Sequence, residues 1–491
     1  MKTKPSFSEF TAMAEKGNVI PVYKEFLCDT ETPVSAYLKI RDNSFSYLLE
    51  SADSGKRWGR YSFIGYKPYL TIQCRDEYME IREEAGEKTV SNVHNPLNAL
   101  RDLCRQFRPI PVYDLGPFQG GLVGYINYDL VRKLEKLPGI SPKGAGVPES
   151  VLMASQRLII FDHLTHQIKV VAFAYIGKNH NLKVIYEQAC QEIDTTIDEL
   201  NQPLTSPPEV DRFSLSDLTS NFNKEDFKEA VQKAKDYVVA GDIIQVVLSQ
   251  RFSGDVSGDD FILYRNLRSL NPSPYMFYLN FGEIKLIGSS PEILVRLTDG
   301  AIELRPIAGT RPRGGSPEKD LAMERELIAD PKERAEHIML VDLGRNDVGK
   351  VAIPGSVTVP QIMGVEYYSH VMHIVSSVEG LLQPGMDGFD LFMAAFPAGT
   401  VTGAPKIRAM EIISELEPSP RGPYAGAVGY FGFNGNMDFC ITIRTITITQ
   451  GRLSIQVGAG IVCDSTPEGE HEETLRKATA LFKAIERAQK P

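Results

Sequence analysis

A proline-rich polar stretch, residues 202–211 (QPLTSPPEVD), divides the chain into two unequal parts. Proline removes a backbone donor and the stretch has no periodic apolar pattern, so we expect it to be irregular and exposed. The chain has 491 residues, 42% of them apolar, which is enough for more than one domain with a large core. We therefore predict an N-terminal domain over 1–200, a linker over 201–212 and a C-terminal domain over 213–491.

Local patterns predict strands and helices in both parts. Residues 46–50 and 157–161 have the apolar patterns of strands. After the linker, Asn223 is a typical helix N-cap and Gly241 a typical helix end. Residues 243–248 (IIQVVL) then predict a buried strand.

The region from residue 424 to residue 463 predicts strands joined by tight turns. Asn434-Gly435 and Gln450-Gly451 are typical turn pairs. Isoleucines alternate first on odd and then on even positions, and the phase changes at Arg444. This change predicts a β-bulge, which would re-aim the arginine side chain.

Two Glu-x-x-Glu pairs, Glu333/Glu336 and Glu470/Glu473, place four carboxylates in the C-terminal part. Glutamates three apart lie on one face of a helix, where like charges repel unless a cation offsets them. All-oxygen ligands suit Mg²⁺, which keeps positions open for water and an anionic substrate. Acidic residues are also common in a first helical turn, so either pair alone is more typical of a solvated helix face.

Helix-start patterns precede both acidic pairs. Asp330 is a typical N-cap and Pro331 a typical first helical residue, with Glu333 as the acid of a capping box. Gly344 is expected to end this helix. Thr466-Pro467 gives the second pair the same kind of start.

Charge and cysteine usage exclude several classes of protein. The net charge is −10, which argues against a nucleic-acid or anionic-membrane surface, although an anionic substrate can still bind a locally basic site. The six cysteines form no C-x-x-C pair, so a zinc site is not expected and reduced thiols are the simplest interpretation. Neither a signal peptide nor a membrane-spanning apolar run is found. We expect a soluble, cytoplasmic protein.

Three glycine-containing segments could contact an anionic ligand. In residues 306–314 (PIAGTRPRG), Gly309 and Thr310 can offer a backbone N–H and a hydroxyl to a carboxylate, although an exposed turn-rich loop is the commoner interpretation. Residues 397–406 (PAGTVTGAPK) lack the spacing of a phosphate loop and favour a turn that opens a helix. Residues 457–461 (VGAGI) let a ligand approach the backbone but lack the dinucleotide-binding spacing.

Histidine is the side chain best suited to proton transfer near neutral pH, and His373 and His370 lie in the stretch 368–375 (YSHVMHIV). A lone histidine in an apolar strand is more often a core residue with satisfied hydrogen bonds. His373 is the first candidate for an acid–base role and His370 competes with it.

Six motifs occur in the order seen in chorismate-utilising enzymes, which the C-terminal part resembles over essentially its whole length. They are residues 306–314, 336–347, 369–373, 399–406, 458–460 and 470–474. The resemblance is strongest to the large subunits, component I, of anthranilate synthase. It implies an α+β fold, a large sandwich of antiparallel β-sheets wrapped by helices.

The resemblance also implies a ligand set. Mg²⁺ would be bound chiefly by Glu336 and Glu473, with Glu333 and Glu470 beside them or acting through water. Chorismate carries two carboxylates, and Arg444 would bind one of them as a charged fork. Further substrate contacts are implied for Tyr424, Gly309, Thr310, Gly458, Ala459 and Gly460.

Four positions are implied to govern the reaction. His373 and Thr400 match active-site positions, and His373 is the candidate for proton handling. Relatives that add water are expected to carry lysine in place of Gln245, and aminodeoxychorismate synthases to carry lysine in place of Ala308. The neutral residues here favour attack of ammonia at C2 and loss of pyruvate, which makes anthranilate, the first committed step of tryptophan biosynthesis.

Two partners are implied as well. The chain has no cysteine in a glycine-flanked nucleophile elbow, so a separate glutamine amidotransferase subunit would deliver ammonia within a hetero-oligomer. Residues 48–51, ending at Ser51, and residues 271–276 match the two segments that form the tryptophan feedback pocket of the family. The inhibitor contacts in the second segment would be Pro274, Tyr275 and Met276.

Two alternatives remain open at this point: an aminodeoxychorismate synthase component I, and a non-catalytic amino-acid-binding regulator with the same fold. The intact acidic pairs, His373 and Arg444 argue against the regulator, because a degenerate relative should have lost some of them.

Overall fold

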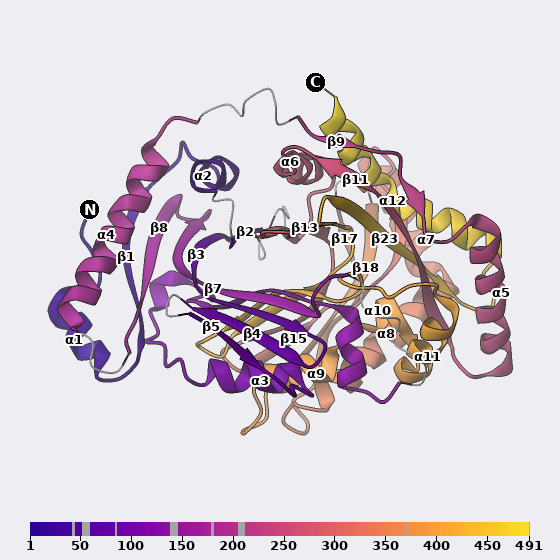
Figure 1. Ribbon diagram of the computed structural model, residues 1–491. Coiled ribbons are helices and arrows are strands. Elements are labelled where there is room, and N and C mark those ends of the chain that lie inside the picture. The colour runs from indigo at the N-terminus through magenta and orange to yellow at the C-terminus, as the bar shows by residue number, and fades with distance from the viewer. Residues whose placement is uncertain are drawn as a thin grey trace.

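The computed structural model describes residues 1–41, 45–51, 59–83, 86–137, 146–177, 181–204, 212–368 and 371–490. Residues 205–211 of the expected linker and His370 lie outside these described residues, so their predicted roles stay predictions. One large antiparallel sheet with helices around it dominates the molecule (Figure 1), which confirms the α+β fold expected from the sequence.

The strands of the described residues join in one hydrogen-bonded network in which the neighbouring strands run antiparallel. They are β1 (Val19–Leu27), β2 (Phe45–Glu50), β3 (Tyr61–Arg75), β4 (Tyr78–Glu83), β5 (Gly86–Val90), β6 (Gly121–Ile126), β7 (Ser150–Asp162), β8 (Gln167–Tyr175), β9 (Ser214–Leu215), β10 (Thr219–Ser220), β11 (Gln245–Ser257), β12 (Tyr275–Phe281), β13 (Ile284–Ser290), β14 (Ile293–Thr298), β15 (Ala301–Leu304), β16 (Ile307–Pro312), β17 (Thr358–Tyr367), β18 (Val371–Leu381), β19 (Gly403–Ala404), β20 (Ala427–Gly432), β21 (Met437–Ile441), β22 (Thr445–Thr449) and β23 (Arg452–Ile461).

Helices cover the outside of this network. They are α1 (Phe7–Ala14), α2 (Pro33–Ile40), α3 (Pro96–Cys104), α4 (Leu182–Asn201), α5 (Lys224–Ala240), α6 (Phe261–Leu270), α7 (Pro317–Ala329), α8 (Pro331–Gly349), α9 (Gly388–Ala395), α10 (Gly399–Thr402), α11 (Lys406–Leu416) and α12 (Pro467–Gln489), with 3₁₀ helices at Tyr113–Leu115 and Tyr128–Lys133. Figure 1 shows α4 near β1 and β8 at the left, and α5 and α12 at the opposite side.

Strands from before and after the linker pair directly with each other. β2 pairs with β12, placing Glu50 opposite Met276, and β6 pairs with β20 along its whole length. The two parts on either side of residues 201–212 therefore share one sheet. The domain boundaries themselves remain predictions.

Alternation along β22 and β23 separates an apolar face from a polar one. Ile446 and Ile448 of β22 lie in an apolar cluster that also contains residues of β23, α6 and α12. The threonines of β22 point to the opposite side of the sheet, because successive side chains of a strand alternate. One face thus belongs to the core, and the other faces a polar cavity.

Local helix and turn predictions hold where short-range contacts decide them. The Asn223 side chain accepts a hydrogen bond of 2.8 Å from the backbone of Asp226, and Gly241 ends α5 with a φ of 84°. The hairpin turns are also confirmed, since Gly435 and Gly451 have φ of 89° and 72°. Asp330 caps α8, and Pro331 is its first residue.

The end of α8 was predicted wrongly. The helix continues through Gly344 to Gly349. A Cβ at Gly344 would lie 2.9 Å from Leu304 of β15, so glycine serves close packing of helix and sheet there rather than helix termination. The capping-box role of Glu333 is also wrong, because its carboxylate accepts from Arg311 at 2.9 Å.

Two further segments differ from expectation. Arg444 lies between two separate strands, β21 and β22, instead of in a bulge of one strand, and its φ of 52° turns the chain. The two strands then pair with different neighbours, β14 and β13. Residues 307–312 form strand β16 instead of a turn-rich loop, with a register shift between Ala308 and Thr310.

In the described part of the chain, helices long and apolar enough to cross a membrane are absent. All six cysteines are free.

Candidate active site

The neighbouring strands β16 and β18 bring His373 beside Gly309 and Thr310. His373 Nδ1 lies 3.1 Å from the carbonyl oxygen of Gly309 and 3.0 Å from Thr310 Oγ1. Burial lowers the pKa of His373 to about 4, so the imidazole is neutral near neutral pH. If Nδ1 donates its hydrogen to the carbonyl oxygen, Nε2 is left as the proton acceptor.

The first two turns of α8 and of α12 bring the two acidic pairs close enough to interact. The pKa of Glu336 is raised, first by burial and then by the charges of Glu333 and Glu473. Burial and the charge of Glu473 also raise the pKa of Glu470. The Glu470 Oε2 atom is buried and lacks a hydrogen-bond partner among the described residues.

Nearby cations offset part of this negative charge. Lys477 Nζ lies 2.8 Å from Glu473 Oε1 and 3.0 Å from the carbonyl oxygen of Gly458. Arg311 Nη1 lies 2.9 Å from Glu333 Oε1. The Glu470 oxygen without a hydrogen-bond partner and the raised pKa of Glu336 indicate that these cations do not fully compensate the four glutamates. We call the four glutamates the acidic cluster.

The acidic cluster is not a finished metal site. Within the described residues, groups of three or more His, Cys, Asp or Glu side chains arranged to hold a metal ion are absent. The donor chemistry nevertheless suits a hard divalent cation, because carboxylate oxygens surround an under-compensated charge. A cation there would compete with Lys477 for Glu473.

Two glycines of β23 make room for side chains from other elements. A Cβ at Gly458 would lie 2.5 Å from the hydroxyl of Tyr424, and one at Gly460 would lie 2.7 Å from Gln245 Nε2. The Ala459 side chain points to the opposite face of the sheet. Because the two glycines have no side chain, the backbone of β23 is uncovered at Gly458 and Gly460 on the face that Tyr424 and Gln245 contact.

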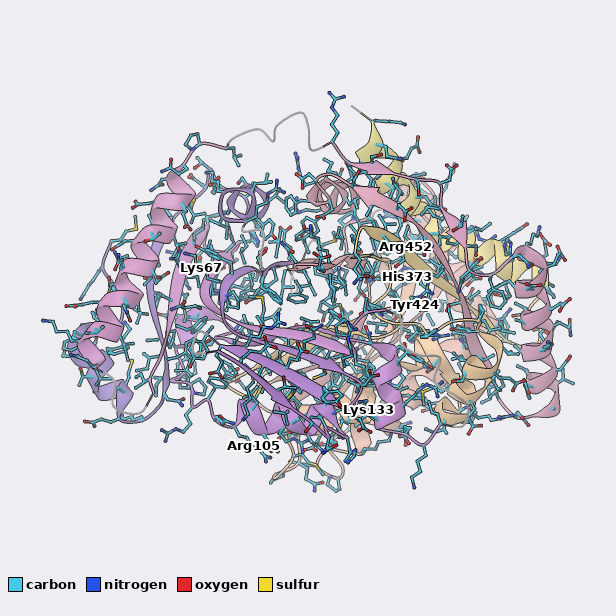
Figure 2. The ribbon with its side chains drawn as sticks, viewed as in Figure 1. Lys67, Arg105, Lys133, His373, Tyr424 and Arg452 are labelled. Carbon is cyan, nitrogen blue, oxygen red and sulfur yellow. The ribbon has the colours of Figure 1, made fainter. Side chains whose placement is uncertain are left out.

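Arg444 is placed by its left-handed backbone next to Tyr424. Burial lowers the pKa of its guanidinium, while Tyr424 and Glu292 oppose the shift. The backbone carbonyl of Arg444 accepts a hydrogen bond of 3.1 Å from Ser289 of β13. Figure 2 shows Tyr424 and His373 in the same region of the molecule.

Glu292 is a site residue that the sequence interpretation missed. It directly precedes β14 and is 8% exposed, and burial raises its pKa to about 8. The charges of Lys477 and Arg444 partly oppose that shift. The available signal was a single acid in the otherwise uncharged run 286–295 (LIGSSPEILV).

The glycine-rich segment 397–406 holds Thr400 beside Glu292. The Thr400 hydroxyl is buried next to that carboxyl without a well-formed hydrogen bond. Lys406, which ends the segment, lies 2.6 Å from the buried carboxylate of Asp347 on α8. This lysine is therefore a structural anchor and not a ligand for phosphate.

The segments predicted to form an inhibitor pocket lie together, because β2 pairs with β12. Met276 pairs with Glu50, which places Ser51 near Pro274 and Tyr275. Ser51 Oγ is buried and lacks a partner among the described residues. The Tyr275 hydroxyl donates to Asp438 at 2.8 Å and accepts from Arg296 at 3.0 Å.

Comparisons with known proteins agree with this architecture. A family model for chorismate binding enzymes matches residues 46–483. The chain is 48% identical over 492 residues to anthranilate synthase component 1 from Aquifex aeolicus, covering 100% of this chain and 99% of that protein. It is 45% identical over 494 residues to the protein of the same description from Acetivibrio thermocellus, covering 99% of each.

Solved structures give the same result. Anthranilate synthase component I from Streptococcus pneumoniae superposes with a TM-score of 0.78 and 34% identity, covering 93% of this chain and 98% of that chain. The isochorismate synthase MenF from Escherichia coli, at 18% identity and a TM-score of 0.73, covers 97% and 99% and shares the fold. The chain therefore belongs to the chorismate-binding enzyme family, within its anthranilate synthase component 1 branch.

Proposed function

We propose that this chorismate-utilising lyase converts chorismate and ammonia into anthranilate, pyruvate and water, the first committed step of tryptophan biosynthesis. The observation that carries the proposal is the neutral amide of Gln245 against Gly460, where a lysine would activate water. Ala308 of β16 likewise has no nucleophilic group. Ammonia is then the nucleophile that attacks C2 of the ring.

Two buried groups have the protonation states that this reaction needs. Glu292, with a pKa of about 8, carries a proton at neutral pH and can give it to the departing C4 hydroxyl, which leaves as water. His373, with a pKa of about 4, is neutral and can take the proton from C2 as the bond between C3 and the enolpyruvyl oxygen breaks. The released enolpyruvate takes up a proton at its methylene carbon and becomes pyruvate. The loss of both groups makes the ring aromatic.

Substrate carboxylates would be held at opposite ends of the site. Glu336 and Glu473, with Glu333 and Glu470 nearby, would hold Mg²⁺ toward the ring carboxylate. When bound, Mg²⁺ would neutralise that carboxylate and stabilise developing charge. Arg444 and Tyr424 then remain for the carboxylate that departs with pyruvate. Gly309, Thr310, Gly458 and Gly460 would complete the contacts.

We also propose that ammonia comes from glutamine through a separate amidotransferase subunit, in a cytoplasmic hetero-oligomer. This is supported by the absence of an amidotransferase nucleophile motif in the sequence. The chain alone should use ammonium salts and not glutamine. Robust glutamine-dependent activity of the isolated chain would contradict the proposal.

Tryptophan is the proposed feedback inhibitor, bound near Ser51, Pro274, Tyr275 and Met276. The orphaned hydroxyl of Ser51 beside β12 supports a ligand at this place. Failure of millimolar tryptophan to inhibit, or unchanged inhibition of Ser51 variants, would contradict this assignment.

One assay separates the candidate functions. The purified chain is mixed with chorismate, Mg²⁺ and ammonium ion, and anthranilate fluorescence is followed while pyruvate is measured in parallel. We expect both products in equal amounts. Production of 4-amino-4-deoxychorismate or salicylate would overturn the choice of reaction, and a chain that binds tryptophan without turnover would be a regulator.

A further inference from the structure

A polar cavity of about 550 Å³ lies beside the candidate active site, and the proposed chemistry does not use it. Strands β10, β11, β22 and β23 contribute its walls, and Tyr424 lines it as well. Its volume is within the range of pockets that bind small molecules. Because Tyr424 also contacts Gly458, the cavity and the substrate site share this side chain.

The lining is rich in hydroxyl groups. Thr445, Thr447 and Thr449 of β22 face the cavity, alternating with the isoleucines that fill the core. Ser454 and Gln456 of β23 extend the polar wall. The Thr445 hydroxyl donates to the carbonyl of Ile443 at 2.9 Å, and the Ser454 hydroxyl donates to the carbonyl of Thr447 at 3.5 Å. The Thr447 hydroxyl can donate to a ligand that accepts hydrogen bonds.

Several polar atoms of this wall lack partners. Thr442 Oγ1, Thr449 Oγ1 and Gln456 Oε1 are buried without hydrogen bonds to any described residue. Buried polar groups are normally paired, because leaving them unpaired is costly. Each of these atoms has less than 1 Å² of accessible surface, so a ligand in the cavity would reach them only after a change of side-chain rotamer.

Two of the three arginines that line the cavity face a carboxylate of this chain. Arg421 Nη2 lies 2.6 Å from Glu417 Oε1. Arg452, labelled in Figure 2, stands opposite Asp255 in the pairing of β11 with β23. Asp255 is the acidic residue among those that line the cavity.

Arg251 differs from the other two arginines. Its guanidinium donates to the hydroxyl of Ser419 at 3.1 Å and to the carbonyl of Pro420 at 3.3 Å, both neutral groups. Within the described residues it makes no ion pair with a carboxylate. Burial and then the charge of Arg452 lower the pKa of Arg251, and the charges of Asp129 and Glu417 oppose part of this shift. A bound anion would oppose it further.

We propose that this cavity binds a small organic carboxylate through Arg251 and the Thr447 hydroxyl of β22. The identity of the ligand rests on the proposed function: pyruvate, set free beside Tyr424, enters the cavity and leaves the enzyme through it. The positive charge of Arg251 favours an anion over ammonium ion. The aromatic product then needs a different exit.

The test is pyruvate binding to the resting enzyme without chorismate, measured by titration calorimetry. Wild type should bind pyruvate saturably. Arg251→Gln should weaken binding about tenfold, the factor that corresponds to ~1.4 kcal/mol. Thr447→Val keeps the side-chain shape, removes one hydroxyl donor and should also weaken binding. Arg265→Gln, an exposed position on α6, is the matched control and should bind like wild type.

Kinetics give the second readout. Pyruvate added as product should inhibit wild type and Arg265→Gln equally, and Arg251→Gln less. Absence of saturable binding to wild type would overturn the proposal. Equal binding by wild type, Arg251→Gln and Thr447→Val would overturn it too, because pyruvate would then lie at the substrate site. Binding that depends on Arg251 in a chain that makes no anthranilate would sink the proposed function and leave the carboxylate site standing.

Discussion

At the scale of single residues, burial sets the charge states on which the proposed reaction depends. The carboxyl of Glu292 has its pKa raised to about 8 and the imidazole of His373 has its pKa lowered to about 4. In both cases burial disfavours the charged form. One group therefore holds a proton and the other can accept one at the same pH, as an elimination requires.

Replacing Glu292 by glutamine should remove the proton donor while keeping the side-chain shape. We expect kcat to fall by about 10²–10⁴-fold, the usual contribution of a positioned acid. In wild type, kcat should decline as pH rises through about 8, because Glu292 then loses its proton. This alkaline limb should be absent from the pH profile of Glu292→Gln.

Glu303→Gln is the control for this experiment. Burial also raises the pKa of Glu303, on β15, which the proposed reaction does not use. The control variant should keep both its turnover and its alkaline limb. A Glu292→Gln enzyme that keeps the limb near pH 8 would show that another group supplies the proton.

The sequence predicted site residues whose chemistry is visible in a motif, such as the acidic pairs and the Gly458–Gly460 run. Glu292 and Lys477 were not predicted. The function of Glu292 depends on burial and on charges from distant segments, among them Lys477 and Arg444. Such surroundings exist only after the strands have packed, so a lone Pro-Glu dipeptide carries little information.

At the scale of elements, helix boundaries were predicted correctly where they depend on contacts between residues close in sequence. Examples are the N-cap of α5 at Asn223 and its C-terminal end at Gly241. The predictions failed where packing against an element distant in sequence determines the backbone conformation. Gly344 remains helical because it packs against Leu304. The break at Arg444 arises because the strands on its two sides join different partners.

The strand β13 connects the predicted inhibitor pocket to the substrate site. The Ser289 hydroxyl donates a hydrogen bond of 2.8 Å to Ser273 Oγ and accepts one of 3.0 Å from Asn271 Nδ2. Ser273 and Asn271 both belong to the segment 271–276. The backbone N–H of Ser289 donates to the carbonyl of Arg444. A ligand that shifts this segment can therefore act on the backbone that positions Arg444.

Ser289→Ala should loosen this connection and raise the tryptophan concentration needed for half inhibition by about fivefold or more, within the usual range of coupling energies. The KM for chorismate should change much less. Inhibition curves at several chorismate concentrations provide the measurement. Ser62→Ala, another buried serine bonded to His163 at 2.8 Å, is the matched control. Unchanged inhibition of Ser289→Ala would exclude this route.

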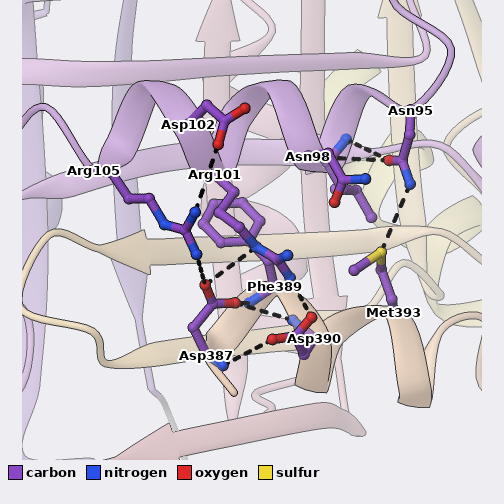
Figure 3. Close-up of polar contacts among 10 residues, drawn as sticks. Asn95, Asn98, Arg101, Asp102, Arg105, Asp387, Phe389, Asp390 and Met393 are labelled. Carbon is purple, nitrogen blue, oxygen red and sulfur yellow. Dashed lines mark hydrogen bonds and ion pairs between the residues drawn. The ribbon is translucent and has the colours of Figure 1, made fainter. Parts of the chain in front are cut away.

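At the scale of the whole molecule, segments from both sides of the linker are joined by side chains as well as by the sheet. Figure 3 shows α3 against the start of α9. Arg101 Nε lies 3.1 Å from Asp387 Oδ2, and its guanidinium also pairs with Asp390 and lies 5.8 Å from the ring of Phe389. Asp387 in turn caps α9.

Arg101→Ala should lower the free energy of unfolding by about 1–2 kcal/mol, because it removes a partly buried ion-pair network and a cation–π contact. Urea denaturation gives the measurement. Arg105→Ala is the control, since the Arg105 side chain is 65% exposed and contacts Asp387 at 3.5 Å. It should cost less than about 0.5 kcal/mol. If both variants lose the same free energy of unfolding, the burial of Arg101 does not add to stability.

The division of the chain into two parts stays a prediction, and the sequence did not indicate how strands pair across it. β2 and β6 precede the linker, yet they pair with β12 and β20. Strand alternation predicts which residues lie on one face and carries no information about the partner strand. Long-range pairing is set by the whole packed core, which local patterns do not contain.

A cut within the predicted linker should therefore leave one particle. If a protease site is placed in residues 202–211, cleavage gives fragments that correspond to 1–200 and 213–491. The pairings β2–β12 and β6–β20 join them through buried strands, so we expect both fragments to elute together in gel filtration and to keep anthranilate synthesis. Arg101→Ala in the cut protein should lower the urea concentration at which the fragments separate, since the covalent link no longer compensates for the lost contact. Fragments that separate without denaturant would show that the shared sheet does not hold the two parts together.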